Sequence, residues 1–293
     1  MAVAAEPPAD DAAPPKERPP LVIVTGASSG IGQAIAVRLA RPGLHLGLVG
    51  RNAEGLDRAA AAVEARGGRA ISSRIDLATH AFEHWVEHVA ERFTVVGLYA
   101  NAGLSAGPAT PRELESAADT ERLVATNLVG TIACVRAVVG AMRAAEKRPD
   151  TARRIGIVSS VSGLLPTPDL AVYSATKAGL VAYAHALRPR LKRDAITVSV
   201  ICPGFITSPM SARHKGAKPF EVSADAAARR IIGAVEAGRR TTIFPFPFAA
   251  MAYLAPLAPG ALIDALVPSF DAHIEPDPRV EPRFAARPLA DKD

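Results

Sequence analysis

The segment LVIVTGASSGIG, residues 21–32, decides the fold. Its first four residues form a short apolar run of the kind that makes a buried strand. Gly26, Gly30 and Gly32 follow, and a helical pattern begins directly behind them. Such glycines let the chain turn sharply and bring backbone N–H groups to a pyrophosphate at the positive end of a helix. The segment predicts a nucleotide-binding strand–turn–helix unit, and a tight turn without a ligand is the alternative for this motif alone.

The same alternation of strand and helix continues along the chain. Short, mostly apolar runs predict strands at residues 21–24, 45–49, 70–75, 95–100, 154–159 and 197–201, with a seventh at Thr241–Phe244. Longer segments predict helices at residues 31–40, 54–66, 79–93, 121–145, 173–193 and 224–238. Strands separated by helices indicate an α/β fold, a doubly wound parallel sheet of about seven strands with helices on both faces.

Composition and charge narrow the class of protein. The chain has 293 residues, of which 49% are hydrophobic and 22% charged, and this balance excludes disorder throughout. The net charge is +5, but the 34 basic residues are scattered among 29 acidic ones and form no stripe. We therefore expect no nucleic-acid partner. Cys134 and Cys202 show neither CxxC nor paired His/Cys spacing. They predict no disulfide scaffold or zinc site, and a reducing, cytoplasmic location.

The ends of the chain differ from its middle. Residues 1–20 are rich in proline and have no apolar run long enough for a signal peptide, so they predict a disordered tail. Residues 271–293 predict a second, irregular tail. Between them we find no repeat and no long linker, which favours a single domain over residues 21–270, including an apolar C-terminal cap at residues 244–267.

Further motifs follow the predicted strands in a recognisable order. They are Asp76 and Leu77 after the third strand, Asn101-Ala102-Gly103 after the fourth, Asn127 in the long helix, Ser160 after the fifth strand, Tyr173 and Lys177 in a later helix, and Pro203-Gly204 after the sixth strand. Together with the TGxxxGxG spacing, this order resembles the short-chain dehydrogenase/reductase family, in its shorter, non-extended branch, over residues 21–244. The resemblance implies a Rossmann fold and an enzyme that interconverts an alcohol and a ketone or aldehyde by hydride transfer.

The chemistry of the tyrosine and the lysine can be argued from their spacing. Tyr173 and Lys177 are four residues apart on one predicted helix and therefore share a face. An ammonium group near a phenol favours the phenolate, so we expect the pKa of Tyr173 to fall from about 10 toward neutrality. Ser160, at the end of a strand, can donate a hydrogen bond to the oxygen on which negative charge develops.

The resemblance assigns a role to each of these groups. It implies that Tyr173 is the general acid in reduction and the general base in oxidation, and that Ser160 orients the substrate. It also implies that Lys177 holds the nicotinamide ribose and that Asn127 braces a water through which protons reach Lys177. The alternatives are a serine that only serves a turn at Ser160 and a buried structural asparagine at Asn127.

The end of the second predicted strand indicates which cofactor binds. In the family, NAD-preferring members carry an acidic residue there, whereas this chain reads Leu48-Val49-Gly50-Arg51-Asn52. The resemblance therefore implies that NADP(H) is preferred, with Arg51 on the 2′-phosphate and Ser28 or Ser29 assisting. NAD(H) stays open as an alternative, because many NADP-dependent relatives carry a second basic residue at the position of Ser29.

Other positions complete the expected cofactor site. The resemblance places Asp76 at the adenine amino group, the Asn101 turn beneath the ribose, and Ser208, where threonine is usual, at the nicotinamide carboxamide. The full set expected to bind the cofactor is Gly26, Ser28, Ser29, Gly30, Ile31, Gly32, Arg51, Asn52, Asp76, Leu77, Asn101, Ala102, Gly103, Tyr173, Lys177, Pro203, Gly204, Ile206 and Ser208.

Two segments bear on the substrate, which we expect to be a small carbonyl compound or alcohol. Residues 207–222 stand where the family has a mobile lid, and Arg213, His214, Lys215 and Lys218 there suggest either an anionic substrate or a solvated basic loop. Residues 244–267 are almost uncharged and contain several prolines, which disfavours a membrane-spanning helix. The alternatives are a cap over an apolar pocket, a subunit contact, or a peripheral patch on a membrane.

The sequence also bears on metal binding, assembly and alternative functions. His80, His84 and His88 are spaced like metal ligands, but their helix is expected on the outer face, so we expect no metal. The family suggests a homodimer or homotetramer through residues 121–145 and 173–193. The alternative functions are a dinucleotide-binding sensor without turnover, which should have lost the tyrosine or lysine, and a nucleotide-sugar-modifying enzyme of surface polysaccharide biosynthesis. Two segments, ARPGLHLGLVGRNAEGL and YANAGLSAG, resemble a bacterial subgroup associated with capsular polysaccharide production.

Overall fold

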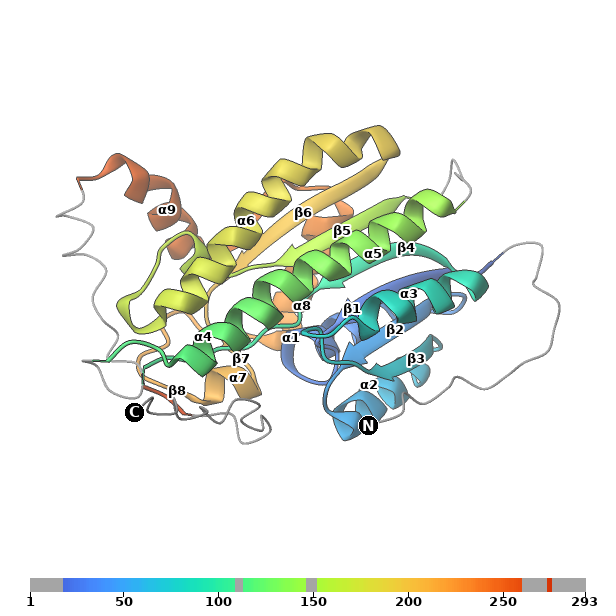
Figure 1. The fold of residues 1–293 in the computed structure, drawn as a ribbon, viewed down its shortest axis with the longest axis horizontal. Coiled ribbons are helices and arrows are strands. Elements are labelled where there is room, and N and C mark those ends of the chain that lie inside the picture. Colours follow the sequence, from blue (N-terminus) through green and yellow to red (C-terminus); the bar gives the residue numbers. More distant parts are fainter. Residues whose placement is uncertain (1–17, 109–112, 146–151, 260–272, 276–293) are drawn as a thin grey trace, which may run out of the picture.

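A seven-stranded parallel sheet forms the centre of the molecule (Figure 1). The computed structural model describes residues 18–108, 113–145, 152–259 and 273–275. The sheet order is β10-β6-β5-β4-β1-β2-β3, and every pair in it is parallel. Its strands are β1 (Pro20–Thr25), β2 (His45–Gly50), β3 (Arg69–Arg74), β4 (Thr94–Ala100), β5 (Arg153–Val158), β6 (Ile196–Pro203) and β10 (Thr241–Phe244). The prediction of a doubly wound α/β fold is confirmed.

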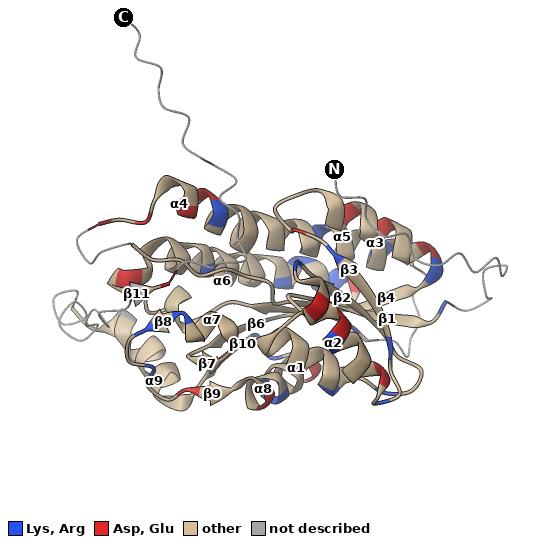
Figure 2. Cartoon of the chain, turned by 90° about the horizontal axis from the view of Figure 1, so that it is seen from below, with Lys and Arg blue, Asp and Glu red and all other residues tan. Residues whose placement is uncertain are grey.

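Helices cover both faces of this sheet (Figure 2). One layer contains α1 (Gly30–Leu39), α2 (Ala53–Glu64) and α8 (Ala224–Glu236). The other contains α3 (Ala81–Arg92), α4 (Ala117–Leu123), α5 (Thr131–Ala144) and α6 (Ala171–Leu191). Each layer has its own apolar cluster against the sheet. The central strands are therefore dry on both sides, which explains why they read as nearly continuous apolar runs.

The predicted helix at residues 121–145 is part of a longer rod with a π-helical turn at Val124–Gly130 between α4 and α5. A Cβ atom at Gly130 would lie 2.6 Å from the carbonyl oxygen of Leu77, so the rod passes very close to the chain that follows β3. By length and composition alone this rod could span a membrane, but half of its most apolar window is buried inside the protein. Such burial is typical of a core helix.

Both predicted tail boundaries need correction. Pro20 is the first residue of β1, and the Pro19 carbonyl accepts a hydrogen bond from the Thr94 N–H, so the ordered chain begins before residue 21. At the other end, β11 (His273–Ile274) pairs antiparallel with β8 (His214–Lys215), although residues 271–293 were expected to be irregular. Main-chain hydrogen bonds to distant strands, which no local pattern reports, cause both differences. Residues 1–17 and 276–293 lie outside the described part.

Short elements complete the end of the molecule where the strands terminate. They are β7 (Ile206–Thr207), which pairs with β9 (Val222–Ser223), the helices α7 (Pro209–Ala212) and α9 (Phe246–Leu254), and 3₁₀ turns at Val161–Gly163, Pro168–Leu170 and Ala255–Leu257. A further 3₁₀ turn, Lys192–Asp194, joins α6 to the start of β6 at the other end of the sheet. Of the expected C-terminal cap, residues 260–267 lie outside the described residues.

Candidate active site

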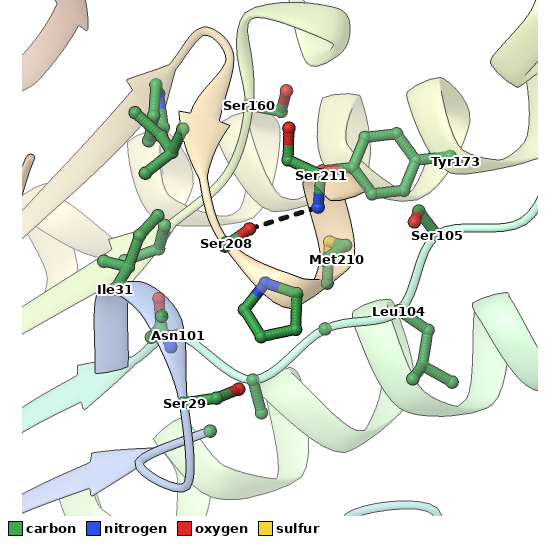
Figure 3. Close-up of a pocket in the computed structure, with 18 of the residues that line it drawn as sticks. Ser29, Ile31, Asn101, Leu104, Ser105, Ser160, Tyr173, Ser208, Met210 and Ser211 are labelled. Atoms are coloured by element: carbon green, nitrogen blue, oxygen red, sulfur yellow. Dashed lines mark hydrogen bonds between the residues drawn. The ribbon is translucent and has the colours of Figure 1, made fainter. Parts of the chain in front are cut away.

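A cavity of about 720 Å³ opens at the carboxyl ends of the strands. The strand order reverses at β1, between β4 and β2, and ligands of open α/β sheets bind at such a switch point. Figure 3 shows Ser29 and Ile31 of the glycine turn on one side of the cavity, and Ser160 and Tyr173 across from them. Ser208 lies between the two sides, where its hydroxyl accepts a hydrogen bond from the Ser211 N–H at 3.2 Å.

The glycine turn forms a cradle that is lined by main-chain atoms, because its glycines have no side chains. Gly26 has a φ of +68°, and a Cβ atom there would lie 2.9 Å from Ala102 Cα. Ser29, the N-cap residue of α1, makes no side-chain cap hydrogen bond. The first N–H groups of α1 therefore face the cavity without a side-chain acceptor, and an anion fits this arrangement. The turn accordingly suits the pyrophosphate of a dinucleotide.

Gly32 was expected among the cofactor-binding residues, but it does not line the cavity. A Cβ atom at Gly32 would lie only 2.2 Å from the carbonyl oxygen of Gly26. This glycine therefore lets α1 pack onto the turn and supports the cofactor site from behind.

A hydrogen-bonded link joins the ends of β1 and β4. The Thr25 hydroxyl accepts from the N–H groups of Asn101 and Ala102, both at 3.1 Å, and Asn101 Nδ2 donates to the Thr25 carbonyl at 3.2 Å. Thr25 was not among the predicted site residues, because its partners are more than seventy positions away. The link holds the glycine turn and the Asn101 turn together as one floor.

Two arginines lie at the far end of the cavity, together with a carboxylate that was not predicted. Arg51 lines it as expected, and so does Arg74, which the sequence analysis missed. Arg74 Nε donates to the Arg51 carbonyl at 3.1 Å, because strand register places Arg74 opposite Gly50. Glu54 also lines this end, so a carboxylate is present although none stands directly at the strand end. Asn52 lines the cavity too, but its side chain caps α2 by accepting from the Gly55 N–H at 2.7 Å.

Ser160, Tyr173 and Lys177 line the opposite end together. Lys177 Nζ is buried, donates to the Val158 carbonyl at 3.1 Å and lies 5.7 Å from the centroid of the Tyr173 ring. Burial lowers the pKa of Lys177 to about 8. Burial also raises the pKa of Tyr173 above its ordinary value, opposed by the Ser160 hydroxyl, which lowers it.

The expectation that Lys177 lowers the pKa of Tyr173 toward neutrality is therefore wrong for this structure. The removal of water from the phenol is the largest cause and raises the pKa of Tyr173, the opposing cause is the hydrogen bond with Ser160, and the Lys177 ammonium group is directed at a main-chain carbonyl instead. At neutral pH the tyrosine consequently holds its proton.

Asn127 lies behind the cavity and does not line it. Its Oδ1 accepts from the Leu104 N–H at 2.7 Å, and its Nδ2 donates to the Leu104 carbonyl at 2.9 Å and to Thr176 Oγ1 at 3.3 Å. The fully buried side chain thus ties the chain after β4 to α6. These contacts position the chain after β4, and the predicted role of Asn127 in proton transfer through a water to Lys177 stays a prediction.

Arg213 and Lys215 of the lid are engaged with residues outside it. Arg213 donates to the Glu275 carbonyl at 2.9 Å and to the Ser105 hydroxyl at 3.3 Å, and Lys215 pairs with the Glu275 carboxylate at 3.3 Å. These contacts close the segment over the cavity, so the positive charges favour a structural explanation over an anionic substrate.

Helix α9 covers the same end of the cavity with its inner face. Phe248 and Met251 line the cavity, and Phe248 packs against Phe205 with ring centroids 6.5 Å apart. Of the alternatives for this segment, the described residues thus support the cap. Phe246, Tyr253 and Leu254 of α9 are exposed, and so is Leu257 of the 3₁₀ turn that follows.

Apart from Gly32 and Asn127, every residue of the predicted site lines this one cavity. The residues that the sequence analysis missed include Arg74, Glu54, Ser105, Leu165, Thr167, Asp169, Phe205, Met210, Ser211 and Ile274. Most of them follow strand ends or lie in the lid and cap. They belong to no motif, so only their position after a strand or within these segments could have indicated them. No group of three His, Cys, Asp or Glu side chains able to hold a metal ion occurs within the described ranges.

Comparisons with known proteins agree with this geometry. The family model for short chain dehydrogenases matches residues 20–218. This chain belongs to the short-chain dehydrogenase/reductase family. It is therefore an oxidoreductase that acts on CH–OH and keto groups with a nicotinamide dinucleotide.

Individual relatives differ in what they bind. A Streptomyces coelicolor protein named "Putative ketoacyl reductase" is 36% identical over 246 residues, which cover 82% of this chain and 91% of the relative. A short-chain dehydrogenase from Sphingobium yanoikuyae in complex with NADPH superposes with a TM-score of 0.66 at 26% identity, over 84% of this chain and 96% of that one. A family member from Burkholderia phymatum in complex with NAD gives a TM-score of 0.71 at 23% identity, over 81% and 92%. The resemblance to a capsular polysaccharide subgroup stays a prediction.

The buried ammonium group of Lys177 predicts a stabilising substitution. Because its pKa in the folded protein is about 8 and its ordinary value is 10.5, the cost of burying the charge is fully present below pH 8 and disappears as the pH rises to 10.5. Lys177→Met should therefore raise the free energy of unfolding at pH 7 by roughly 1–3 kcal/mol. The gain should shrink between pH 8 and pH 10.5.

Urea unfolding of both proteins without added cofactor, across this pH range, measures the effect. Lys192→Met, at an exposed lysine, is the control and should change stability by less than about 0.5 kcal/mol. A gain that does not depend on pH would contradict the argument.

Proposed function

We propose that this enzyme interconverts an alcohol and a ketone or aldehyde with NADP(H), and that Tyr173 transfers the proton. The observation that carries the proposal is the convergence of Ser160, Tyr173 and Lys177 at one end of a cavity whose other end holds a glycine cradle and two arginines. The relative named as a ketoacyl reductase supports carbonyl chemistry as the reaction class.

The state of the side chains suits reduction. The cofactor, when bound, supplies the hydride that reaches the carbonyl carbon. Ser160 and Tyr173 donate hydrogen bonds to the carbonyl oxygen, where negative charge develops, and Tyr173 then releases its proton to it. A raised pKa keeps that proton on Tyr173 at neutral pH. Lys177 stabilises the resulting phenolate, since its ammonium group lies 5.7 Å from the centroid of the ring.

The preference for NADP(H) rests on the pair Arg51 and Arg74. A guanidinium group offers a planar fork to a phosphate, and two of them at the far end of the cavity suit a 2′-phosphate. Glu54 would favour a free ribose hydroxyl, but it faces the exposed Arg58 on its own helix at 3.9 Å. One similar structure contains NADPH and another contains NAD, so the comparisons do not distinguish the two cofactors. The preference for NADP(H) is therefore proposed from the two arginines alone.

Assembly and location belong to the same proposal. We place a homodimer or homotetramer contact on the rod that contains α4 and α5 and on the neighbouring α6, because Val124 and Val129 of the rod are exposed apolar side chains. A cytoplasmic location is supported by Cys134 and Cys202, which are buried and unpaired.

Removal of the proposed proton donor should separate chemistry from binding. Tyr173→Phe deletes only the hydroxyl group, so turnover of a ketone should fall by several orders of magnitude while the Kd for NADPH stays within about twofold. The measurements are NADPH oxidation at 340 nm and fluorescence titration of the cofactor. Tyr183→Phe, on the same helix but outside the cavity, is the control and should keep parental turnover. Retained turnover in Tyr173→Phe would refute the assignment.

The arginine pair should discriminate between the two cofactors. Arg51→Ala should weaken NADPH binding by about 10- to 150-fold, the loss of one charge-assisted contact of about 1.5–3 kcal/mol, and leave NADH nearly unchanged. Arg74→Ala should weaken NADPH less, by about 3- to 10-fold, because this side chain is more exposed.

Fluorescence titration of NADPH and NADH into each variant measures both effects. Arg69→Ala, at the opposite end of the same strand β3, is the matched control and should alter neither affinity. Equal losses for NADPH and NADH would show that the arginines support the loop only. A parent that prefers NADH would overturn the cofactor proposal.

The assembly proposal predicts a dimer or tetramer mass in sedimentation velocity at micromolar concentration. Val129→Arg places a charge in the proposed contact and should shift the distribution toward the monomer. A parent that sediments as a monomer would remove this part of the proposal.

A further inference from the structure

Two polar atoms in the substrate end of the cavity are buried and have no hydrogen-bond partner among the described residues. They are His214 Nε2, on a side chain that is only 7% exposed, and Thr167 Oγ1. Both residues line the cavity. An unpaired buried polar atom costs free energy, so such atoms in a native site call for a ligand that satisfies them. Neither atom has a role in the proton transfer described above.

The surroundings of His214 define what Nε2 can do. The ring packs against Phe205, with centroids 5.2 Å apart, and also makes a hydrogen bond to the backbone of Ala217 that raises its pKa. Because Nε2 has no partner among the described residues, we assign this bond to the other ring nitrogen, Nδ1, as the donor.

The ring is neutral at pH 7. Burial and the charge of Lys218 lower the pKa of His214 below its ordinary value, against the opposing effects of Asp169 and Ala217. A neutral ring that donates through Nδ1 leaves a lone pair on Nε2, so this atom accepts a hydrogen bond from the ligand.

Much of the rest of this end is apolar. Leu165, Phe205, Phe248, Met251 and Ile274 line it. The charged residues present do not favour an anionic ligand: Arg213 is bonded to Ser105 and Glu275, and the Asp169 carboxylate acts on His214 and would repel an anion. A neutral ligand group that donates to Nε2 and can also accept from a threonine hydroxyl matches the site.

We propose that His214 and Thr167 form a subsite for a hydroxyl group carried on an otherwise apolar ketone substrate. A hydroxyl group both donates and accepts, so it satisfies Nε2 as donor and Thr167 as acceptor or donor. This inference rests on the proposed function, because it names the class of carbonyl compound that the same cavity takes. A site built to bond a hydroxyl discriminates strongly against the analogue that lacks it.

The test compares straight-chain methyl ketones, from pentanone to decanone, with the matching ω-hydroxy methyl ketones. For the hydroxy ketone of suitable length, the parent should show a kcat/KM about tenfold above that of its unsubstituted partner. His214→Phe and Thr167→Val should each reduce this ratio at least threefold. His214→Gln, which keeps an acceptor near the position of Nε2, should retain part of the preference.

A matched control is available on β10. Thr242 Oγ1 is also buried without a partner among the described residues, but Thr242 does not line the cavity. Thr242→Val should therefore keep the parental preference. A parent with equal kcat/KM for both members of every pair would overturn the subsite, because the two atoms would then serve only bound water. Variants of His214 and Thr167 that keep the full preference would overturn it as well.

A second readout separates the subsite from the proposed function. If the parent reduces none of these ketones, the proposed function fails, and the subsite is tested by calorimetric titration of the same compounds into the NADP⁺-loaded protein. Tighter binding of a hydroxy ketone than of its partner, lost in His214→Phe and Thr167→Val, would support the subsite independently of turnover. Equal binding of both compounds would overturn it.

Discussion

The close approach of α1 to the strand that precedes it is the constraint on which the site depends. Helix α1 can pack directly onto the glycine turn because Gly32 has no side chain. A Cβ atom at this position would lie 2.2 Å from the Gly26 carbonyl oxygen. This packing directs the N–H groups of α1 into the cavity and sets the turn against Thr25 and Asn101, which join β1 to β4. A larger residue at either glycine would move the anion cradle and the floor of the site together.

Burial of the reacting end works against the stability of the empty protein and in favour of catalysis. Lys177 is held in dry surroundings with a lowered pKa of about 8, and Tyr173 keeps its proton for the same reason. Both groups are thus set for a negative charge that arrives only when substrate and cofactor are bound. Functional sites commonly bear such a cost, which the large apolar clusters on both faces of the sheet offset.

The lid and cap decide what reaches those groups. In the sequence, Arg213 and Lys215 suggested an anionic substrate as one alternative. In the structure they hold the lid to Ser105 and Glu275. Glu275 thereby compensates the charge of Lys215, and α9 adds Phe248 and Met251 to the lining of the cavity. What remains is an apolar chamber with a neutral histidine, and a chamber of this kind selects by shape and by individual hydrogen bonds more than by net charge.

The amino-acid sequence by itself determined the order of strands and helices, the glycine turn, and the positions of Ser160, Tyr173 and Lys177, because these depend on local periodicity and on motifs of short spacing. Only the tertiary structure decided the rest. Arg74 reaches Arg51 through strand register, Asn127 reaches Leu104 across twenty-three positions, and β11 reaches the lid from the end of the described chain. The pKa of Tyr173 followed burial rather than its spacing from Lys177. Solvent exclusion and long-range pairing arise when distant segments pack, so no local pattern contains them.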